Sequence, residues 1–272
     1  HRLKKIDVSS VNGIHAQAGT ILGTSNRCGT EGREAEFFNR YGELGLDGLV
    51  VAGGDGTFSG LQVFRDQLKL IGVPKTIDND LAGTDITFGY DTACSVVAEA
   101  VDELRATAHA HRRIIVIETM GRTAGWIALG GGLASYADVI LIPERPFARE
   151  ALLRFINDHH ARGQRGLICV VSEGAKAQGE SATVAFRVKG APQEERLGGI
   201  AQNLAHWLEH ETGWEGRHVV LGHLQRSRSP TTTDRFLTCA MGVKVAQLIQ
   251  AKQWGYAAVY RDGKVTAAPI TD

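Results

Sequence analysis

The sequence is poor in several residue types, and the shortage of cysteine argues against two classes of protein. Its 272 residues contain only 4 cysteines, 6 prolines and 2 methionines. The cysteines (Cys28, Cys94, Cys169 and Cys239) are widely spaced and form no C-x-x-C pair. This spacing is typical of reduced thiols in a cytoplasmic protein, and it argues against a disulfide framework or a zinc site.

Net charge and long apolar runs are also lacking. Lys plus Arg number 30 and Asp plus Glu number 30, so the formal net charge is zero. Because a protein that binds nucleic acid through its phosphates normally has a basic excess, no nucleic-acid partner is expected. The uncharged apolar stretch Thr123–Ala137 is shorter than a bilayer span and is interrupted by Gly130, Gly131 and Gly132, so no membrane association is expected.

The first residues contain no signal-peptide pattern, and position 1 is His rather than Met. We therefore expect a fragment or an incompletely ordered chain. Glycine is the abundant residue, at 33 of 272. The glycines fall at the ends of apolar runs, where the backbone must approach another group closely.

Short apolar runs alternate with longer segments of helical period. The expected strands are Gly48–Ala52, Leu70–Val73, Ile114–Glu118, Val139–Pro143, Leu167–Ser172, His218–Leu221 and Ala257–Tyr260. The expected helices are Glu34–Leu44, Thr57–Leu68, Asp91–His109, Ala124–Ala134, Arg149–Ala161, Leu197–Glu211 and Thr233–Ala251. The strand runs lack strict alternation, which indicates sheets covered on both faces. Repeated strand–helix units predict an α/β fold with mostly parallel sheets.

Two further segments have a distinct pattern. Ala175–Arg196 is less apolar and is expected to be an irregular insertion or loop. Tyr256–Ile270 predicts a hairpin that turns at Asp262-Gly263.

Gly53-Gly54-Asp55-Gly56-Thr57 follows an apolar strand and precedes a helix. Glycines at such a junction let backbone N–H groups surround an anion at the helix N-terminus. An aspartate beside phosphates needs a cation between them, and Mg²⁺ is the natural one. A tight turn with Asp55 as the helix N-cap explains the pentapeptide equally well.

Pro74–Asp80, with the sequence Pro-Lys-Thr-Ile-Asp-Asn-Asp, follows the next apolar run. In an extended chain Thr76, Asp78 and Asp80 would line one edge. A carboxylate there could act as general base for a substrate hydroxyl. A capping Asx-turn is the alternative, but it would not require Lys75 and Thr76.

Basic residues gather in two more segments. Arg122 follows Met120-Gly121 at a strand-to-helix junction, where a guanidinium can meet phosphate oxygens. Arg217, His223 and Arg226 are expected to form a cationic cluster at the carboxyl end of a strand, suited to a phosphomonoester. A surface arginine and a solvated basic loop are the plainer interpretations. The histidines lack metal-ligand spacing and are expected on the surface or on helix faces.

Together, the segments Gly53–Thr57, Pro74–Asp80, Met120–Arg122 and Leu221–Arg226 resemble the motifs of the 6-phosphofructokinase family in order and spacing. Further matches are Gly19–Thr24 with Arg27, Thr87–Ala93, Pro143-Glu144, Glu173, Ser229-Pro230 and Asp234-Arg235. The resemblance runs from about Gly19 to the end of the chain. It implies two Rossmann-like three-layer α/β/α domains with the active site in the cleft between them. Residues 1–89 with 225–272 would form the nucleotide domain, and residues 90–224 the sugar-phosphate domain.

The resemblance implies transfer of a phosphoryl group from MgATP to the C1 hydroxyl of fructose 6-phosphate, a step of glycolysis. Asp78 would be the general base, assisted by Thr76 and Asp80, and Arg122 would stabilise the transferring group. The donor would be bound by Arg27, Gly54, Gly56, Thr57 and Lys75, with Asp55 holding Mg²⁺. The sugar would be bound by Met120, Gly121 and Glu173, and its 6-phosphate by Arg217, His223 and Arg226. In this family Arg113 and Arg217 reach into the neighbouring subunit's site, which implies a homodimer or homotetramer.

Gly56 and Lys75 give a mixed signature for the donor. In the pyrophosphate-dependent branch an aspartate usually replaces the glycine, and a lysine stands at the place of Lys75. Gly56 leaves room for a nucleotide, whereas a lysine is tolerated near ATP phosphates. ATP is therefore expected, with pyrophosphate as the alternative.

The chain departs from the family pattern in three places. The N-terminal glycine-rich segment is absent, the C-terminal segment is shortened, and Ser227-Arg228 replaces two glycines. A central strand of the first sheet would then be missing, and we expect this chain to be inactive without it. A catalytically silent regulatory subunit stays open, although Asp78, Arg122 and Asp55 are all retained. A lipid-kinase or NAD-kinase relative would share Gly53–Thr57 but leaves Pro74–Asp80 and Leu221–Arg226 unexplained.

Overall fold

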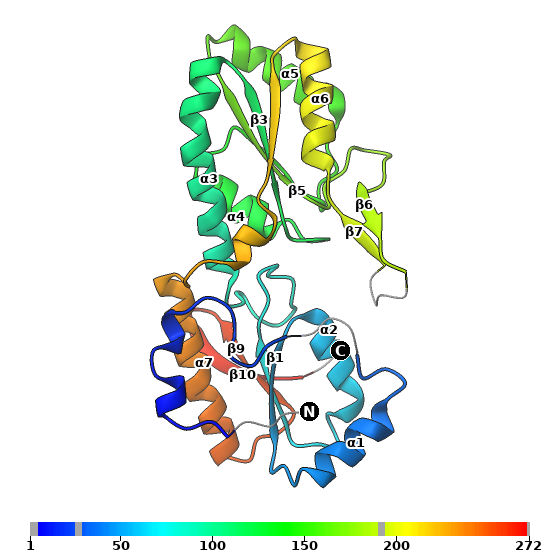
Figure 1. Cartoon of the computed structure of the whole chain (residues 1–272), viewed down its shortest axis with the longest axis vertical. Helices are drawn as coiled ribbons and strands as arrows, with labels where there is room; N and C mark the ends of the chain where they lie inside the picture. The colour runs from blue at the N-terminus through cyan, green and yellow to red at the C-terminus, as the bar shows by residue number, and fades with distance from the viewer. Residues whose placement is uncertain (1–4, 25–28, 190–193, 271–272) are drawn as a thin grey trace. The chain divides into compact units, whose positions relative to one another are not determined.

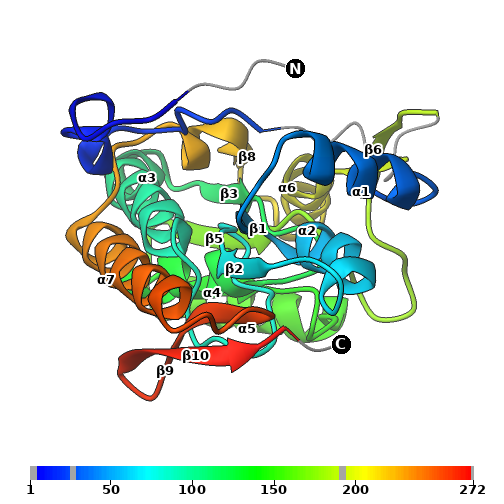
Figure 2. The same cartoon turned by 90° about the horizontal axis from the view of Figure 1, so that it is seen from below.

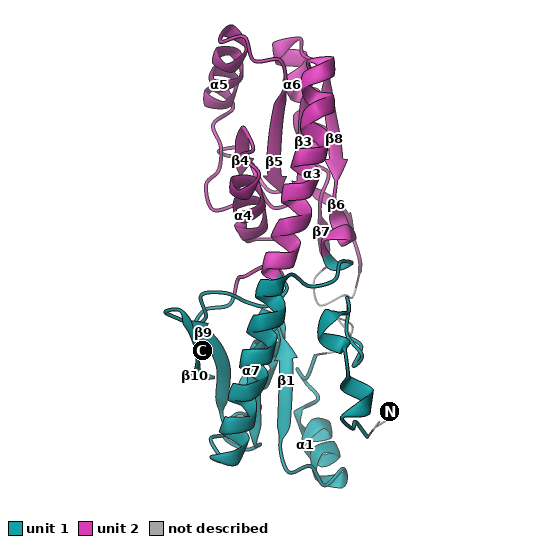
Figure 3. Ribbon diagram, turned by 90° about the vertical axis from the view of Figure 1, so that its left-hand side faces the viewer, with its two compact units in different colours: residues 1–75, 81–89, 226–272 teal, residues 76–80, 90–225 magenta. Residues whose placement is uncertain are grey.

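The computed structural model describes residues 5–24, 29–189 and 194–270, which form two compact units (Figure 3). Unit 1 comprises residues 1–75, 81–89 and 226–272, and unit 2 comprises residues 76–80 and 90–225. Residues 76–80 were expected in the first domain, but they group with unit 2. Ile77 explains the difference, because it packs against the buried cluster of unit 2 that contains Ile117 and Leu221.

Unit 2 is built on a parallel sheet in the order β4-β5-β3-β8. Figure 1 labels its two middle strands, β5 and β3. Its strands are β3 (Ile114–Thr119), β4 (Val139–Leu141), β5 (Leu167–Ser172) and β8 (Gly216–Val220). Its helices are α3 (Tyr90–His111), α4 (Trp126–Ala134), α5 (Arg149–Ala161) and α6 (Ile200–Thr212). Every residue of β3 and β5 is buried, as expected for strands covered on both faces.

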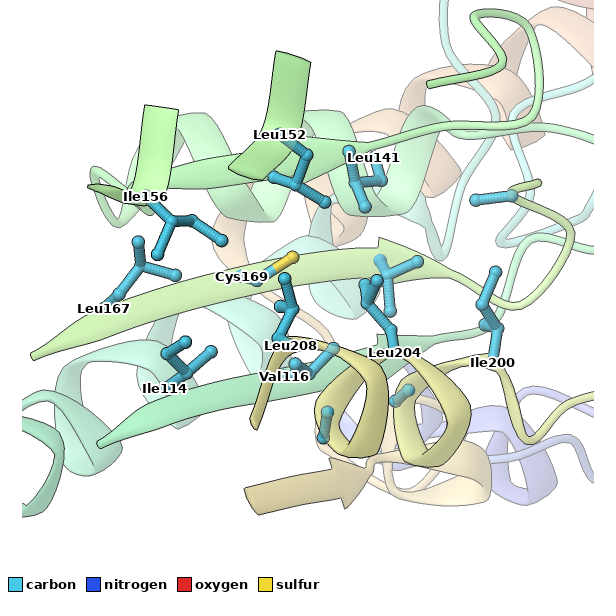
Figure 4. Packing of buried hydrophobic residues seen from close by; sticks show 14 residues of the cluster. Ile114, Val116, Leu141, Leu152, Ile156, Leu167, Cys169, Ile200, Leu204 and Leu208 are labelled. Carbon is cyan, nitrogen blue, oxygen red and sulfur yellow. The ribbon is translucent and has the colours of Figure 1, made fainter. Parts of the chain in front are cut away.

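Alternate residues of the central strands supply the two halves of this core. Ile114 and Val116 pack with residues of α5 and α6, including Leu152, Ile156, Leu204 and Leu208 (Figure 4). Ile115 and Ile117 pack instead with α3 and α4. Because successive side chains of a strand point to opposite faces, helices lie on both sides of the sheet. Unit 2 is a three-layer α/β/α structure, as predicted.

Unit 1 contains a second sheet in the order β1-β2-β9-β10. Its strands are β1 (Leu49–Gly53), β2 (Leu70–Pro74), β9 (Tyr256–Arg261) and β10 (Lys264–Pro269), with only the β9–β10 pair antiparallel. Its helices are α1 (Glu34–Glu43), α2 (Asp55–Leu61) and α7 (Thr232–Gln250), and a 3₁₀ turn, η3 (Gln62–Phe64), extends α2. Phe37 and Phe64 pack on one face, and Leu237 and Met241 of α7 pack on the other. Figure 2 shows α7 beside β9 and β10.

The hairpin expected at Asp262-Gly263 joins β9 to β10. Both residues have positive φ, 49° and 76°, as a type I′ turn requires. In contrast, the segment expected to be irregular contains two antiparallel strands, β6 (Val184–Arg187) and β7 (Glu195–Leu197). All of β6 is exposed. Its sequence does alternate, with Ala185 between Val184 and Phe186, but these two apolar side chains are exposed and join no core.

Short 3₁₀ turns complete the described chain: η1 (Ser9–Val11), η2 (Ile14–Ala16) and η4 (Gly222–Arg226). Cys94, Cys169 and Cys239 are free thiols, and Cys28 lies outside the described residues. Among the helices of the described residues, none combines the length and the hydropathy that a membrane span requires.

Candidate active site

The loop Met120-Gly121-Arg122 leaves the carboxyl end of β3 beside the carboxyl end of β5. The Arg122 backbone N–H donates to Glu173 Oε1 at 2.9 Å, and the Glu173 N–H donates to the Thr119 carbonyl at 2.9 Å. Ligands of open α/β sheets bind at this edge, where the carboxyl ends of neighbouring strands meet. The structure therefore brings Arg122 and Glu173 together, as a binding site at this edge would need.

Two glycines make the Arg122 loop possible. Gly121 has φ of 133°, and a Cβ there would overlap the carbonyl oxygen of Ala124. A Cβ on Gly174 would overlap the carbonyl oxygen of Arg122 itself. Arg122 has φ of 53°, a left-handed conformation that is rare for a side-chain-bearing residue. Its backbone is thus held tightly while its side chain is exposed.

Asp78 lies close enough to Glu173 to act on it electrostatically. Burial raises the pKa of Glu173 above its usual range, and the negative charges of Asp78 and Glu118 raise it further. Hydrogen bonds from the Arg122 and Gly121 backbone oppose this shift and lower the pKa. A half-buried carboxyl group with a shifted pKa beside a second carboxylate is a common feature of functional sites.

The segment around Asp78 is not extended as expected. The Asp78 N–H donates to Thr76 Oγ1 at 3.1 Å, which forms a local turn. Asn79 has φ of 53°, and a residue in the left-handed region interrupts an extended chain. The prediction that Thr76, Asp78 and Asp80 line one edge is therefore wrong, and Asp80 is exposed.

In unit 1, the turn Gly53–Thr57 joins β1 to α2, as expected. A Cβ on Gly53 would overlap the Thr57 side chain, whereas a Cβ on Gly56 would meet nothing within 4 Å. The Lys75 N–H donates to the Gly53 carbonyl at 2.8 Å, so the exposed Lys75 lies beside this turn. Gly53 is thus required by packing, whereas Gly56 borders open space. Arg27, expected to reach the same donor, lies outside the described residues.

The acidic side chains near the donor turn could supply only part of the coordination shell of a Mg²⁺ ion. Among the described residues, no group of three or more His, Cys, Asp or Glu side chains could enclose a metal ion. In phosphoryl-transfer sites, however, Mg²⁺ is commonly held by one or two carboxylates, with phosphate oxygens and water completing the shell. The exposed carboxylate of Asp55 fits an ion of that kind.

The prediction that Arg217, His223 and Arg226 form one cluster is wrong for the side chains of a single chain. Strand β8 begins at Gly216, so Arg217 lies near its amino end and pairs in register with Ile115. His223 and Arg226 belong to η4, which follows the carboxyl end of β8. Strand geometry separates Arg217 from that end by roughly 10 Å. Arg217 and Arg113 instead both pair with Glu215.

Two buried polar residues beside the site escaped the sequence analysis. Glu118, 3% exposed, accepts hydrogen bonds from the Gly199 and Ala201 N–H groups, at 3.0 Å and 2.9 Å. Gln225, 1% exposed, accepts one from the Met120 N–H at 2.8 Å. An acidic residue inside the apolar run Ile114–Glu118 was the available signal for the first. Gln225 stands between Leu224 and Arg226 and carried no comparable signal.

Comparison with known proteins places this site in context. Residues 1–249 match the family model described as Phosphofructokinase. The chain is 38% identical over 275 residues to "ATP-dependent 6-phosphofructokinase 3" of Streptomyces coelicolor, an alignment that covers 98% of this chain and 80% of the relative. It is 41% identical over 282 residues to "ATP-dependent 6-phosphofructokinase 2" of Clostridium perfringens, covering 96% and 76%. A solved phosphofructokinase from Saccharomyces cerevisiae superposes with a TM-score of 0.83 at 28% identity, over 98% of this chain and 38% of the yeast chain.

Proposed function

Because the chain belongs to the phosphofructokinase family, we propose that it transfers a phosphoryl group from ATP to the C1 hydroxyl of fructose 6-phosphate. The observation that carries the proposal is the convergence of Asp78, Arg122 and Glu173 in unit 2. A base, a cation and a sugar-binding carboxylate are the groups that this reaction needs.

Asp78 is the general base. Its carboxylate takes the proton of the C1 hydroxyl as that oxygen bonds to the γ-phosphorus and ADP leaves. Thr76 holds the Asp78 backbone through its hydroxyl, and Asp80 assists from the exposed side. The Arg122 guanidinium stabilises the negative charge that spreads over the transferring group.

The sugar is bound by Met120, Gly121 and Glu173, and its 6-phosphate by His223 and Arg226. Arg113 and Arg217 contribute to the same phosphate, but in the site of a second copy of the chain. Their position at the amino end of β3 and β8 supports this assignment, because a ligand at the carboxyl edge is out of their reach in the same chain. The working unit is then a homodimer or homotetramer with shared sites.

The donor is bound by Gly54, Gly56, Thr57 and Lys75, together with Arg27. The open space beside Gly56 supports ATP, since a nucleotide needs room where a larger residue would exclude it. The exposed Lys75 beside the turn favours pyrophosphate as a second candidate donor. Mg²⁺ held by Asp55 would neutralise charge on the donor phosphates.

A coupled assay of the intact protein, with ATP or pyrophosphate at saturating fructose 6-phosphate, tests the function and the donor. Asp78→Asn should lower turnover by about 100-fold or more, since it removes the base, while sugar-phosphate binding persists. Asp102→Asn, the same change at an exposed position of α3, is the matched control and should have no effect.

The assay separates the alternatives. Strong turnover with pyrophosphate alone would contradict ATP as the donor. No turnover in the wild-type protein would favour the silent regulatory subunit, and an Asp78→Asn variant as active as the control would contradict the assignment of the base.

A further inference from the structure

Three charged side chains form one group at the amino edge of the unit 2 sheet. Arg113 directly precedes β3, and Glu215 and Arg217 flank the first residue of β8. Glu215 Oε2 accepts from Nε of Arg113, and Glu215 Oε1 accepts from Nη2 of Arg217. One carboxylate thus holds two guanidinium groups.

Strand register explains why the three side chains meet. The Ile114 N–H donates to the Glu215 carbonyl at 3.0 Å, and Ile115 lies level with Arg217. Side chains two residues apart on a strand share a face. Arg113, Glu215 and Arg217 therefore leave the sheet on the same face, and Glu215 lies between the two arginines in sequence and in contact.

The contacts leave donors available for a second acceptor. Glu215 occupies the Nε of Arg113 and not its two terminal nitrogens. The Arg217 Nη1 donates to the Gly216 carbonyl at 2.8 Å, so that side chain is fixed at a second point. Arg217 is nevertheless 52% exposed. Two guanidinium groups and one carboxylate leave a net charge of +1, which attracts a phosphate while limiting repulsion between the arginines.

The charge state of the group is well defined. The hydrogen bond and the charge of Arg113 hold the pKa of Glu215 below its usual range, and Arg217 and His111 lower it further. Glu215 is therefore an acceptor throughout the neutral pH range.

We propose that Glu215 is a positioning residue that holds Arg113 and Arg217 side by side for the phosphate group of a sugar phosphate bound by a second copy of this chain. The inference rests on the proposed function, which identifies that ligand. Long charged side chains lose conformational freedom when they bind, and a pair that is already held in place loses less. Glu215 itself touches no substrate and acts through the arginines.

Glu215→Gln tests this role in the intact protein. The amide keeps one acceptor oxygen but presents N–H donors to the other guanidinium, so one arginine is released. The KM for fructose 6-phosphate should rise about tenfold, equivalent to about 1.4 kcal/mol. The KM for ATP and kcat should stay within about twofold, because neither the donor nor the reacting oxygen contacts this group.

Two variants control the measurement. Glu215→Asp keeps the carboxylate and should hold the KM within about threefold of wild type. Glu180→Gln removes a carboxylate that pairs with Arg149 through two hydrogen bonds, at 3.0 Å and 3.1 Å, and should leave every parameter unchanged.

Equilibrium binding of fructose 6-phosphate, measured by calorimetry, keeps this inference separable from the proposed function because it needs no turnover. A tenfold weaker Kd in Glu215→Gln supports the inference even if the wild-type protein is not a kinase. An unchanged or tighter Kd would overturn it. So would a variant that dissociates into single chains, since Glu215 would then be an assembly contact.

Discussion

Glu173 combines several opposing influences in one side chain. It is half-buried, it has Asp78 and Glu118 as like-charged neighbours, and it accepts a backbone hydrogen bond from Arg122. Burial and like charge both favour the protonated form. An ionised Glu173 therefore lowers the free energy of unfolding. The proposed contact with the sugar gives a functional reason for a carboxylate at this place.

This destabilisation predicts how Glu173→Gln changes stability with pH. Because the pKa of Glu173 is raised in the folded state, the unfolded chain ionises first as pH increases. The wild-type fold thus loses stability above about pH 4, the usual carboxyl range, and does not regain it at higher pH. The glutamine variant escapes that loss and should be the more stable protein at pH 7, with weaker sugar-phosphate binding.

Urea unfolding of both proteins from pH 4 to pH 8 measures the difference. The advantage of the variant should shrink towards the acid end, where both residues are uncharged. A difference that grows towards low pH would contradict the raised pKa.

Sequence reasoning named Asp78, Arg122 and Glu173 but could not supply their geometry. The residues followed from motif order, whereas the left-handed backbone of Asn79 is a local choice that no alternation pattern records. Arg217 was misplaced for a different reason. The expected strand His218–Leu221 already left Arg217 at its amino end, and β8, which begins at Gly216, keeps it there, so this residue was wrongly grouped with residues that follow the strand.

At the level of elements, buried strands were predictable and exposed ones were not. Every residue of β3 and β5 is buried, and the apolar residues that begin both strands stand out as continuous runs. Strand β6 is exposed on both faces, so its residues follow no burial pattern, and its pairing with β7 depends on backbone hydrogen bonds. The role of Glu118 could not be predicted from its own strand either, because its hydrogen-bond partners lie on another element.

The α6 helix depends on Glu118 at its start. The buried carboxylate accepts hydrogen bonds from the Gly199 and Ala201 N–H groups, which have no carbonyl partner within the first turn. Its negative charge also lies at the positive end of the helix dipole, which stabilises the helix. Glu118→Ala should therefore lower the free energy of unfolding by about 2 kcal/mol or more, since charge-assisted hydrogen bonds are lost in a buried place.

Urea denaturation at pH 7 gives that value, and amide exchange at Gly199 and Ala201 should accelerate. Glu150→Ala, in the exposed first turn of α5, is the control and should change stability only slightly. If the two variants were equally stable, Glu118 would not be a helix cap.

At the scale of the whole molecule, the proposed chemistry divides between chains. In that proposal, one site combines Asp78 of one copy with Arg217 of a second copy. Mixed assemblies should therefore regain activity that neither parent has.

Asp78→Asn and Arg217→Ala proteins, each weakly active at low sugar phosphate, provide the test. When they are mixed, dissociated and reassembled, random pairing makes half of the pairs hybrid, and each hybrid has one intact site of two. About a quarter of wild-type activity should return. No recovery, in assemblies shown by mass to be hybrid, would place both residues in the site of the same chain.

The contact between Gly174 and the Arg122 carbonyl has a consequence for sequence variation. Position 174 contributes no side chain to any ligand, yet even a methyl group there would displace the arginine backbone. Under selection for activity it should tolerate as few substitutions as the reacting residues do. A survey of viable variants would then mark this glycine as essential for a purely steric reason.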